Sequence, residues 1–126
     1  MTDEKRLYPR LSLTLEDGYF GHFTTADQQT LVASIVNLSV GGINIVVAKA
    51  DQDKIKEGDT LTLIDIAGNT QLSFLSDVIG QIRWIKDLGV PKFVSVGCRF
   101  EDLPEPSREQ ISRFVDTERR TRGQYN

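Results

Sequence analysis

The sequence contains few of the residues that disulfide frameworks, metal centres and membrane spans require. Among its 126 residues, Cys98 is the single cysteine and His22 the single histidine, which excludes an internal disulfide and a His/Cys metal cluster. No apolar run approaches the roughly 20 residues that a membrane-spanning helix needs. Residues 1–6 lack the apolar segment of a secretory signal. We therefore expect a cytoplasmic protein, without metal or cofactor, that does not insert into a membrane.

Strong positive charge and catalytic groupings are missing as well. A formal net charge of −3, with no basic face interleaved with aromatic residues, argues against a protein that binds DNA or RNA. Neither His22 nor Cys98 has an acid, base or nucleophile at a recognisable spacing, so we do not expect an enzyme. The basic residues are unevenly spread, and a local basic site for a small anion is compatible with their distribution. Those near the two ends of the chain are Lys5, Arg6 and Arg10, and Arg108, Arg113, Arg119, Arg120 and Arg122.

Most of the chain has the patterning of short β-strands. Alternation of Leu11, Leu13 and Leu15 with polar residues predicts a half-buried first strand. The runs 31–36 and 43–48 are apolar on both faces, which is typical of a sheet curled into a barrel whose outside is partly covered. The predicted strands are residues 11–16, 19–25, 31–36, 43–48, 60–66, 73–86 and 93–100.

A helix is predicted to follow the strands. Residues 107–110 have the capping-box pattern, and Ile111, Phe114 and Val115 fall on one face of a helix over 107–119. About half a dozen short strands followed by one helix indicate a mainly β fold, a small antiparallel β-barrel with a C-terminal α-helix. The length allows one compact domain and leaves no room for a second core.

The segment 37–42, with the sequence NLSVGG, joins two of the apolar strands. Asn37 and Ser39 project to the same side of an extended backbone because they are two residues apart. Gly41 and Gly42 are expected to turn the chain with positive φ and to let a ligand approach bare N–H groups. The segment also has a local interpretation, in which both polar side chains cap their own turn.

A second motif lies near the N-terminus, where Arg6 and Arg10 stand four residues apart. Residues 1–10 are polar and Pro9 disfavours a helix there, so we expect a flexible arm. Taken alone, two arginines on such an arm are ordinary solvated charges. Together with the Asn-x-Ser-x-x-Gly pattern of residues 37–42, however, they resemble the paired signature of the PilZ domain family.

The resemblance extends roughly from residue 5 to residue 115, because residues 81–84 and 96–103 also look like late strands of that family. It implies a six-stranded antiparallel barrel with a terminal helix, here a single domain over 11–122 that follows the arm 1–10. It also implies a receptor for the bacterial messenger cyclic di-GMP. This ligand holds two guanines on a ring of two phosphodiesters, and arginine meets the O6 and N7 acceptors of guanine with two parallel hydrogen bonds.

The family's binding residues carry over to the positions of this sequence that match its motifs. Lys5 stands where family members often have a further arginine, and a cation there can hold a second ligand molecule. Trp84 either stacks on a guanine or, as is common for a lone tryptophan in a strand, belongs to the core. Arg99 either reaches a ligand phosphate or, as is more common for a strand arginine, is a solvated charge. The resemblance implies ligand contacts by Arg6, Arg10, Asn37, Ser39 and Gly42, with Gly41, Lys5 and Trp84 as weaker candidates.

The expected function is that of a ligand-sensing adaptor. Binding of cyclic di-GMP would order the arm over the barrel and change the surface offered to an unidentified effector protein, in motility, biofilm or virulence control. The alternative is a ligand-independent interaction module, such as the PilZ domains that work in pilus assembly. We expect a monomer or a weak homodimer, because the apolar outer faces of the strands suit either a second chain or a covering helix.

Overall fold

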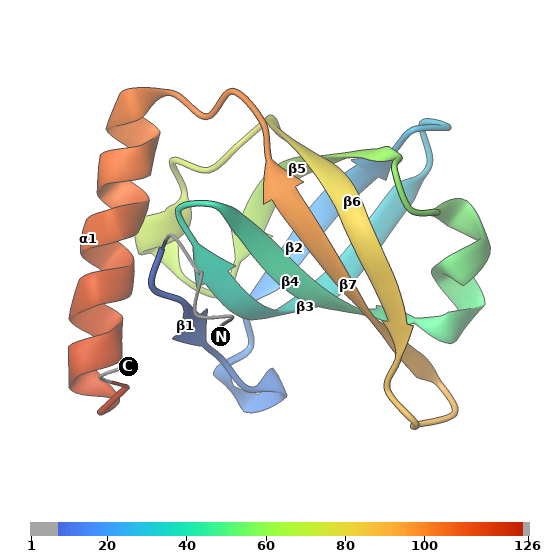
Figure 1. Cartoon of the computed structure of the whole chain (residues 1–126), viewed down its shortest axis with the longest axis horizontal. Helices are drawn as coiled ribbons and strands as arrows, with labels where there is room; N and C mark the ends of the chain where they lie inside the picture. Colours follow the sequence, from blue (N-terminus) through green and yellow to red (C-terminus); the bar gives the residue numbers. More distant parts are fainter. Residues whose placement is uncertain (1–7, 125–126) are drawn as a thin grey trace, which may run out of the picture.

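The computed structural model describes residues 8–124, whose arrangement is shown in Figure 1. Within this range no helix is both long and apolar enough to cross a membrane. The strands are β1 (Leu11–Ser12), β2 (Phe20–Thr25), β3 (Thr30–Ser39), β4 (Gly42–Ala48), β5 (Thr60–Ala67), β6 (Val78–Asp87) and β7 (Phe93–Phe100). They are followed by the helix α1 (Glu105–Thr121), and three short 3₁₀ helices lie in the connections: η2 (Leu15–Asp17), η3 (Lys49–Lys54) and η4 (Thr70–Leu72).

Six of the strands, β2 to β7, form a closed antiparallel barrel. They pair in the order β3-β2-β5-β6-β7-β4, and the pairing of β4 with β3 closes the ring. The long strand β3 serves three neighbours, since it pairs with β2, with the short β1 at Leu38, and with β4 on its other edge. The helix α1 stands beside the barrel, next to β1 (Figure 1). The predicted mainly β fold, a six-stranded barrel with a C-terminal helix, is confirmed.

Alternate residues of the strands fill the barrel. In β4, Ile43, Ile45 and Val47 point inward and are at most 3% exposed, while the residues between them are only half-buried. The helix adds its predicted apolar stripe, all three residues of which are buried. The apolar outer face expected for β3 is partly uncovered, because Val32 is 53% exposed.

The first predicted strand is wrong beyond Ser12. The chain turns into η2, where Leu15 is 57% exposed instead of half-buried. The Asp17 carboxylate accepts a hydrogen bond from the Thr14 backbone N–H at 2.7 Å, and Gly18 ends the turn with a left-handed φ of 74°. These local hydrogen bonds replace the strand ladder that the alternating leucines predicted.

Two further predicted boundaries are wrong. The strand expected from residue 73 begins only at Val78, because the segment before it folds inward and leaves Leu72 and Leu75 fully buried. The helix begins at Glu105, before the predicted capping box. Pro106 follows in the first turn, where a missing backbone N–H leaves no intrahelical acceptor unpaired.

An ion-pair cluster ties the end of α1 to the start of the barrel. Arg122 donates from Nη1 to both carboxylate oxygens of Asp17 at 3.1 Å, and from Nε to Glu118 at 3.1 Å. The three side chains are only 22–26% exposed. Gln124 extends the tie by exchanging two hydrogen bonds with the backbone of Ser12, at 2.9 and 3.0 Å.

Arg122→Gln is expected to lower the free energy of unfolding by about 1 kcal/mol at pH 7, because it removes a partly buried, two-oxygen ion pair. The pKa of Asp17 lies below its ordinary value of 3.8, owing first to the Thr14 N–H and then to Arg122. A carboxyl group whose pKa is lower in the folded than in the unfolded protein stabilises the fold when the pH is above its unfolded-state pKa. This stabilisation is lost as the pH falls through the folded-state pKa. The difference between variant and wild type in urea unfolding should therefore shrink below pH 3.8.

The matched control for this prediction is Arg113→Gln, because Arg113 is exposed on the same helix and lies outside the ion-pair cluster. This control should unfold like wild type at each pH. A difference between Arg122→Gln and wild type that stays constant down to the lowest pH would contradict the role given to Asp17.

Candidate functional site

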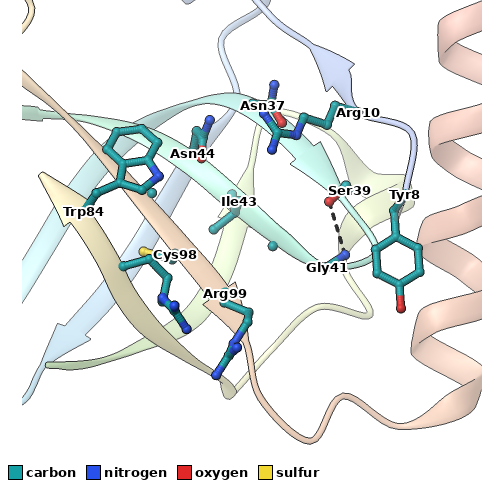
Figure 2. A pocket seen from close by; sticks show the side chains of 13 residues that line it. Tyr8, Arg10, Asn37, Ser39, Gly41, Ile43, Asn44, Trp84, Cys98 and Arg99 are labelled. Atoms are coloured by element: carbon teal, nitrogen blue, oxygen red, sulfur yellow. Dashed lines mark hydrogen bonds between the residues drawn. The ribbon is translucent and has the colours of Figure 1, made fainter. Parts of the chain in front are cut away.

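A groove lies on the outside of the barrel, along the end of β3, the start of β4 and the facing parts of β6 and β7 (Figure 2). It is open to solvent and has a volume of about 260 Å³. No aspartate or glutamate lines it among the residues that the structure describes. The lining residues are Tyr8, Arg10, Asn37, Ser39, Gly41, Gly42, Ile43, Asn44, Arg83, Trp84, Gly97, Cys98 and Arg99.

The groove brings together the two halves of the paired signature. Asn37 and Ser39 line it from the end of β3, and Arg10 lines it from the N-terminal segment (Figure 2). The Ser39 hydroxyl also accepts a hydrogen bond from the Gly41 N–H at 3.1 Å, so the turn-capping interpretation holds for Ser39 as well. Lys5 and Arg6 lie outside the described residues, and Arg10 is therefore the one arginine of the pair whose position is known.

The need for glycine in the turn has a different physical cause from the positive φ that the sequence suggested. Neither Gly41 nor Gly42 has the positive φ expected of them, so that prediction is wrong. Gly42 pairs with Arg99 across the β4–β7 ladder, and a Cβ at Gly42 would lie 2.2 Å from the carbonyl oxygen of Cys98. Glycine is thus required at position 42 because the backbones of two strands approach closely there.

Trp84 lies in the groove wall and not in the barrel core, so the core interpretation of this residue is wrong. The indole ring rests on Gly97 of the neighbouring strand, where any Cβ would come within 2.2 Å of the ring. The two residues face each other in the β6–β7 ladder. Lys86 places its ammonium group 5.0 Å from the ring centroid. The indole is half-buried, so part of it remains exposed along the groove.

Two strand arginines, Arg83 and Arg99, also line the groove. The sequence suggested a phosphate contact for Arg99 only as the less favoured alternative, and it suggested nothing for Arg83. Arg99 on β7 is exposed, as interpreted, and it also borders the groove together with the exposed Arg83 of β6. The period-two pattern of β7 was the available signal for Arg99, because it turns Gly97 and Arg99 outward. Arg83 had no such signal, because it is left out of the ladder at the register shift just before Trp84.

The chemistry of the groove suits binding of an anion and not nucleophilic catalysis. Among residues 8–124, the groove lining contains three guanidinium groups, those of Arg10, Arg83 and Arg99, and no aspartate or glutamate, so this part of the lining is basic although the chain has a net negative charge. Burial raises the pKa of the Cys98 thiol to about 12, so this group stays protonated and is a poor nucleophile. His22 pairs with Asp65 at 2.5 Å on β2 and β5, outside the groove lining.

The metal-ligating side chains are scattered over the barrel. Residues 8–124 contain no group of three or more His, Cys, Asp or Glu side chains that could hold a metal ion. The groove is lined instead by hydrogen-bonding, cationic and aromatic groups, which are the kinds of groups that bind organic ligands.

Comparison with known proteins gives a family match along most of the chain. A family model described as PilZ domain matches residues 4–117. Among solved structures, the PilZ domain of YcgR from Escherichia coli with c-di-GMP aligns with a TM-score of 0.75 and 22% identity, covering 94% of both chains. No curated protein matches the sequence.

Longer proteins align as well. A crystal structure of YcgR from Escherichia coli in complex with c-di-GMP aligns with a TM-score of 0.72 and 21% identity, over 94% of this chain and 48% of that chain. The Bacillus subtilis inhibitor of motility, MotI/DgrA, aligns with a TM-score of 0.67 and 17% identity, over 97% and 54% of the two chains. The chain spans about half the length of these two proteins.

Proposed function

The chain belongs to the PilZ domain family, and from this membership we propose that it is a receptor that binds cyclic di-GMP in the groove of β3, β4, β6 and β7. The observation that carries the proposal is the meeting of Arg10 with Asn37 and Ser39, which come from two separate sequence motifs, in one groove. Guanidinium, amide and hydroxyl groups are those that recognise the edges of guanine. The solved YcgR structures with c-di-GMP support the identity of the ligand.

The guanine bases are assigned to the signature residues. Arg10 would donate two parallel hydrogen bonds to O6 and N7 of one guanine, and Arg6, on the same arm, would contact the other guanine or a phosphate. The Asn37 side-chain carbonyl would accept from guanine N1–H or N2–H, and Ser39 would add its hydroxyl. The backbone at Gly42 lies in the groove lining and is open to close approach.

The phosphodiesters and the base faces are assigned to the other groove residues. Arg83 and Arg99 carry charge on the strand side of the groove, where they would pair with phosphate oxygens. Trp84 would stack on a guanine face. Lys5 and Gly41 are the weaker candidates: a cation at Lys5 would hold a second, stacked ligand molecule, and Gly41 would contribute backbone.

Isothermal titration tests the proposal directly. Cyclic di-GMP should give saturable heat with one or two molecules bound per chain. Cyclic di-AMP, whose adenine has an amino donor where guanine has O6, should bind at least about tenfold more weakly. Equal affinities for cyclic di-GMP and cyclic di-AMP would show that the groove does not select guanine. No heat from either, in protein that unfolds cooperatively in urea, would overturn the proposal.

Trp84 provides an optical test of where the ligand lies. It is the single tryptophan of the chain, so saturating cyclic di-GMP should change the tryptophan emission. Trp84→Ala should weaken binding roughly five- to hundredfold, because base–aromatic stacking is worth about 1–3 kcal/mol. Phe93→Ala is the control, since Phe93 is 39% exposed and lies outside the groove lining. Unchanged emission at saturation would exclude stacking on Trp84.

We also propose that the output passes through a partner protein in the cytoplasm. Messenger binding would fix Arg6 over the groove that Arg10 already lines and so order the arginine arm over the barrel. This would change the surface offered to the partner and act on motility, biofilm formation or virulence. The alternative, a ligand-independent module as in pilus assembly, would hold its partner equally with and without messenger. Capture from cell extract on the immobilised chain, with and without cyclic di-GMP, separates the two: retention that depends on ligand supports the receptor, and equal retention supports the alternative.

A further inference from the structure

Tyr8 connects the groove to the helix α1. Its hydroxyl accepts a hydrogen bond from Arg108 Nη2 at 3.2 Å, and the guanidinium carbon of Arg108 lies 5.7 Å from the centroid of the Tyr8 ring. The same ring lies against the β3–β4 turn, because a Cβ at Gly41 would be 3.0 Å from Tyr8 Cδ2. Figure 2 shows Tyr8 between this turn and the helix. The Tyr8 side chain therefore lines the groove and also contacts the first turns of α1.

We infer that Tyr8 and Arg108 form a positioning pair for the proposed messenger site: their contact holds the chain where Arg10 lines the groove, and messenger binding in turn stabilises the start of α1. The inference rests on the proposed function, because it concerns the same site.

The backbone around Arg10 is held on both sides. Leu11, which follows it, is fully buried and pairs with Leu38. Tyr8, which precedes it by two residues, is held by Arg108, and the ring of the intervening Pro9 restricts φ to a narrow range near −65°. A binding group on an anchored backbone loses less conformational entropy when its ligand binds, so the Tyr8 contact should raise affinity.

Arg108 belongs to the first turns of α1. Its backbone N–H donates to the carbonyl of Pro104, and its Nε lies 3.7 Å from the carboxylate of Glu105. The hydrogen bond to Tyr8 is the main cause that raises the pKa of Arg108 above its ordinary value. Arginine stays protonated in proteins, so its guanidinium is a donor for the Tyr8 hydroxyl.

Thermodynamic linkage makes the coupling reciprocal. If the arm position that favours messenger binding also favours the Tyr8–Arg108 contact, bound messenger must strengthen that contact. Amide hydrogen exchange over residues 105–111 should then slow when cyclic di-GMP is bound. The far end of α1 is held independently by Arg122, so its exchange should respond much less.

The experiment compares single and paired substitutions. Tyr8→Phe removes the accepting hydroxyl and keeps the ring, whereas Arg108→Gln removes the guanidinium. Each should weaken cyclic di-GMP binding about three- to tenfold in isothermal titration. The affinity of the double variant for cyclic di-GMP should be at most about twofold lower than that of the single variant that binds less tightly, because both substitutions remove the same contact. Arg108→Lys should recover part of the loss, and the exposed control Arg113→Gln should bind like wild type.

The outcomes distinguish the pair from a merely structural role and from failure of the proposed function. The inference is overturned if wild type binds, Tyr8→Phe and Arg108→Gln bind equally well, and messenger leaves exchange over 105–111 unchanged. It is also overturned if the variants weaken binding only in proportion to a loss of global stability in urea. If wild type gives no heat, the proposed function fails. Exchange in ligand-free protein then still tests the contact: equal exchange over 105–111 in Tyr8→Phe and Arg113→Gln would rule it out.

Discussion

Cyclic di-GMP is expected to bind Arg10→Ala about five- to hundredfold more weakly than wild type, because one bidentate contact between arginine and guanine is worth about 1–3 kcal/mol. Arg10 is exposed, whereas the next residue, Leu11, is fully buried. Isothermal titration gives the affinity, and urea unfolding verifies that the fold is intact.

Arg99→Ala is the informative companion to this variant. An arginine that contacts phosphate should contribute equally to cyclic di-GMP and cyclic di-AMP, so its loss should weaken both ligands alike and reduce the salt dependence of binding. An arginine that contacts guanine should contribute mainly to cyclic di-GMP, so Arg10→Ala should bring the two affinities closer together. Affinity of Arg10→Ala equal to that of wild type would exclude Arg10 from the ligand contact.

Gly42→Ala is expected to lower the free energy of unfolding by roughly 2–4 kcal/mol, at the upper end of overpacking costs. A Cβ at this position would lie 2.2 Å from the Cys98 carbonyl oxygen, which is backbone and has no rotamer to escape into. The β4–β7 ladder must separate locally to admit the methyl group, and Arg99, the ladder partner of Gly42, moves with it. Urea unfolding should report the loss of stability, and titration a loss of messenger binding.

Gly41→Ala is the matched control, one residue earlier in the same turn. The nearest atom to its Cβ would be Cδ2 of the Tyr8 ring at 3.0 Å, and a side chain can turn aside where a backbone cannot. The cost in unfolding free energy should therefore stay below about 1 kcal/mol. Equal destabilisation by the two substitutions would show that the turn, and not the strand contact, requires glycine.

The barrel was largely predictable because its evidence is local. Period-two alternation and turn residues identify most strands, and the exact match of the predicted 93–100 to β7 reflects an inward series of apolar residues without a competing local interaction. The prediction fails at Leu15, which is exposed, because a competing local hydrogen bond forms there. The Asp17 carboxylate bonds the Thr14 backbone, which competes with a strand ladder, and hydrophobic alternation carries no information about that competition.

The site was predictable only where it coincides with motifs. Arg10, Asn37 and Ser39 are found from the resemblance of their two motifs to the PilZ family signature, and all three line one groove in the structure. Trp84 and Arg83 depend on the pairing register of β6 with β7, including a register shift beside them. The indole of Trp84 packs on Gly97 of the neighbouring strand, and a single sequence does not specify which residues face each other across a ladder.

Closure of the ring between β4 and β7 has a consequence for synthesis of the protein. The groove needs Gly42 and its ladder partner Arg99, which are made far apart in time on a ribosome that adds about 5–20 residues per second. A nascent chain that has released β2 to β6 still lacks one wall of the groove. The groove is therefore complete only after β7 has emerged and paired with β4. If the proposed function holds, cyclic di-GMP cannot guide the folding steps that precede this pairing.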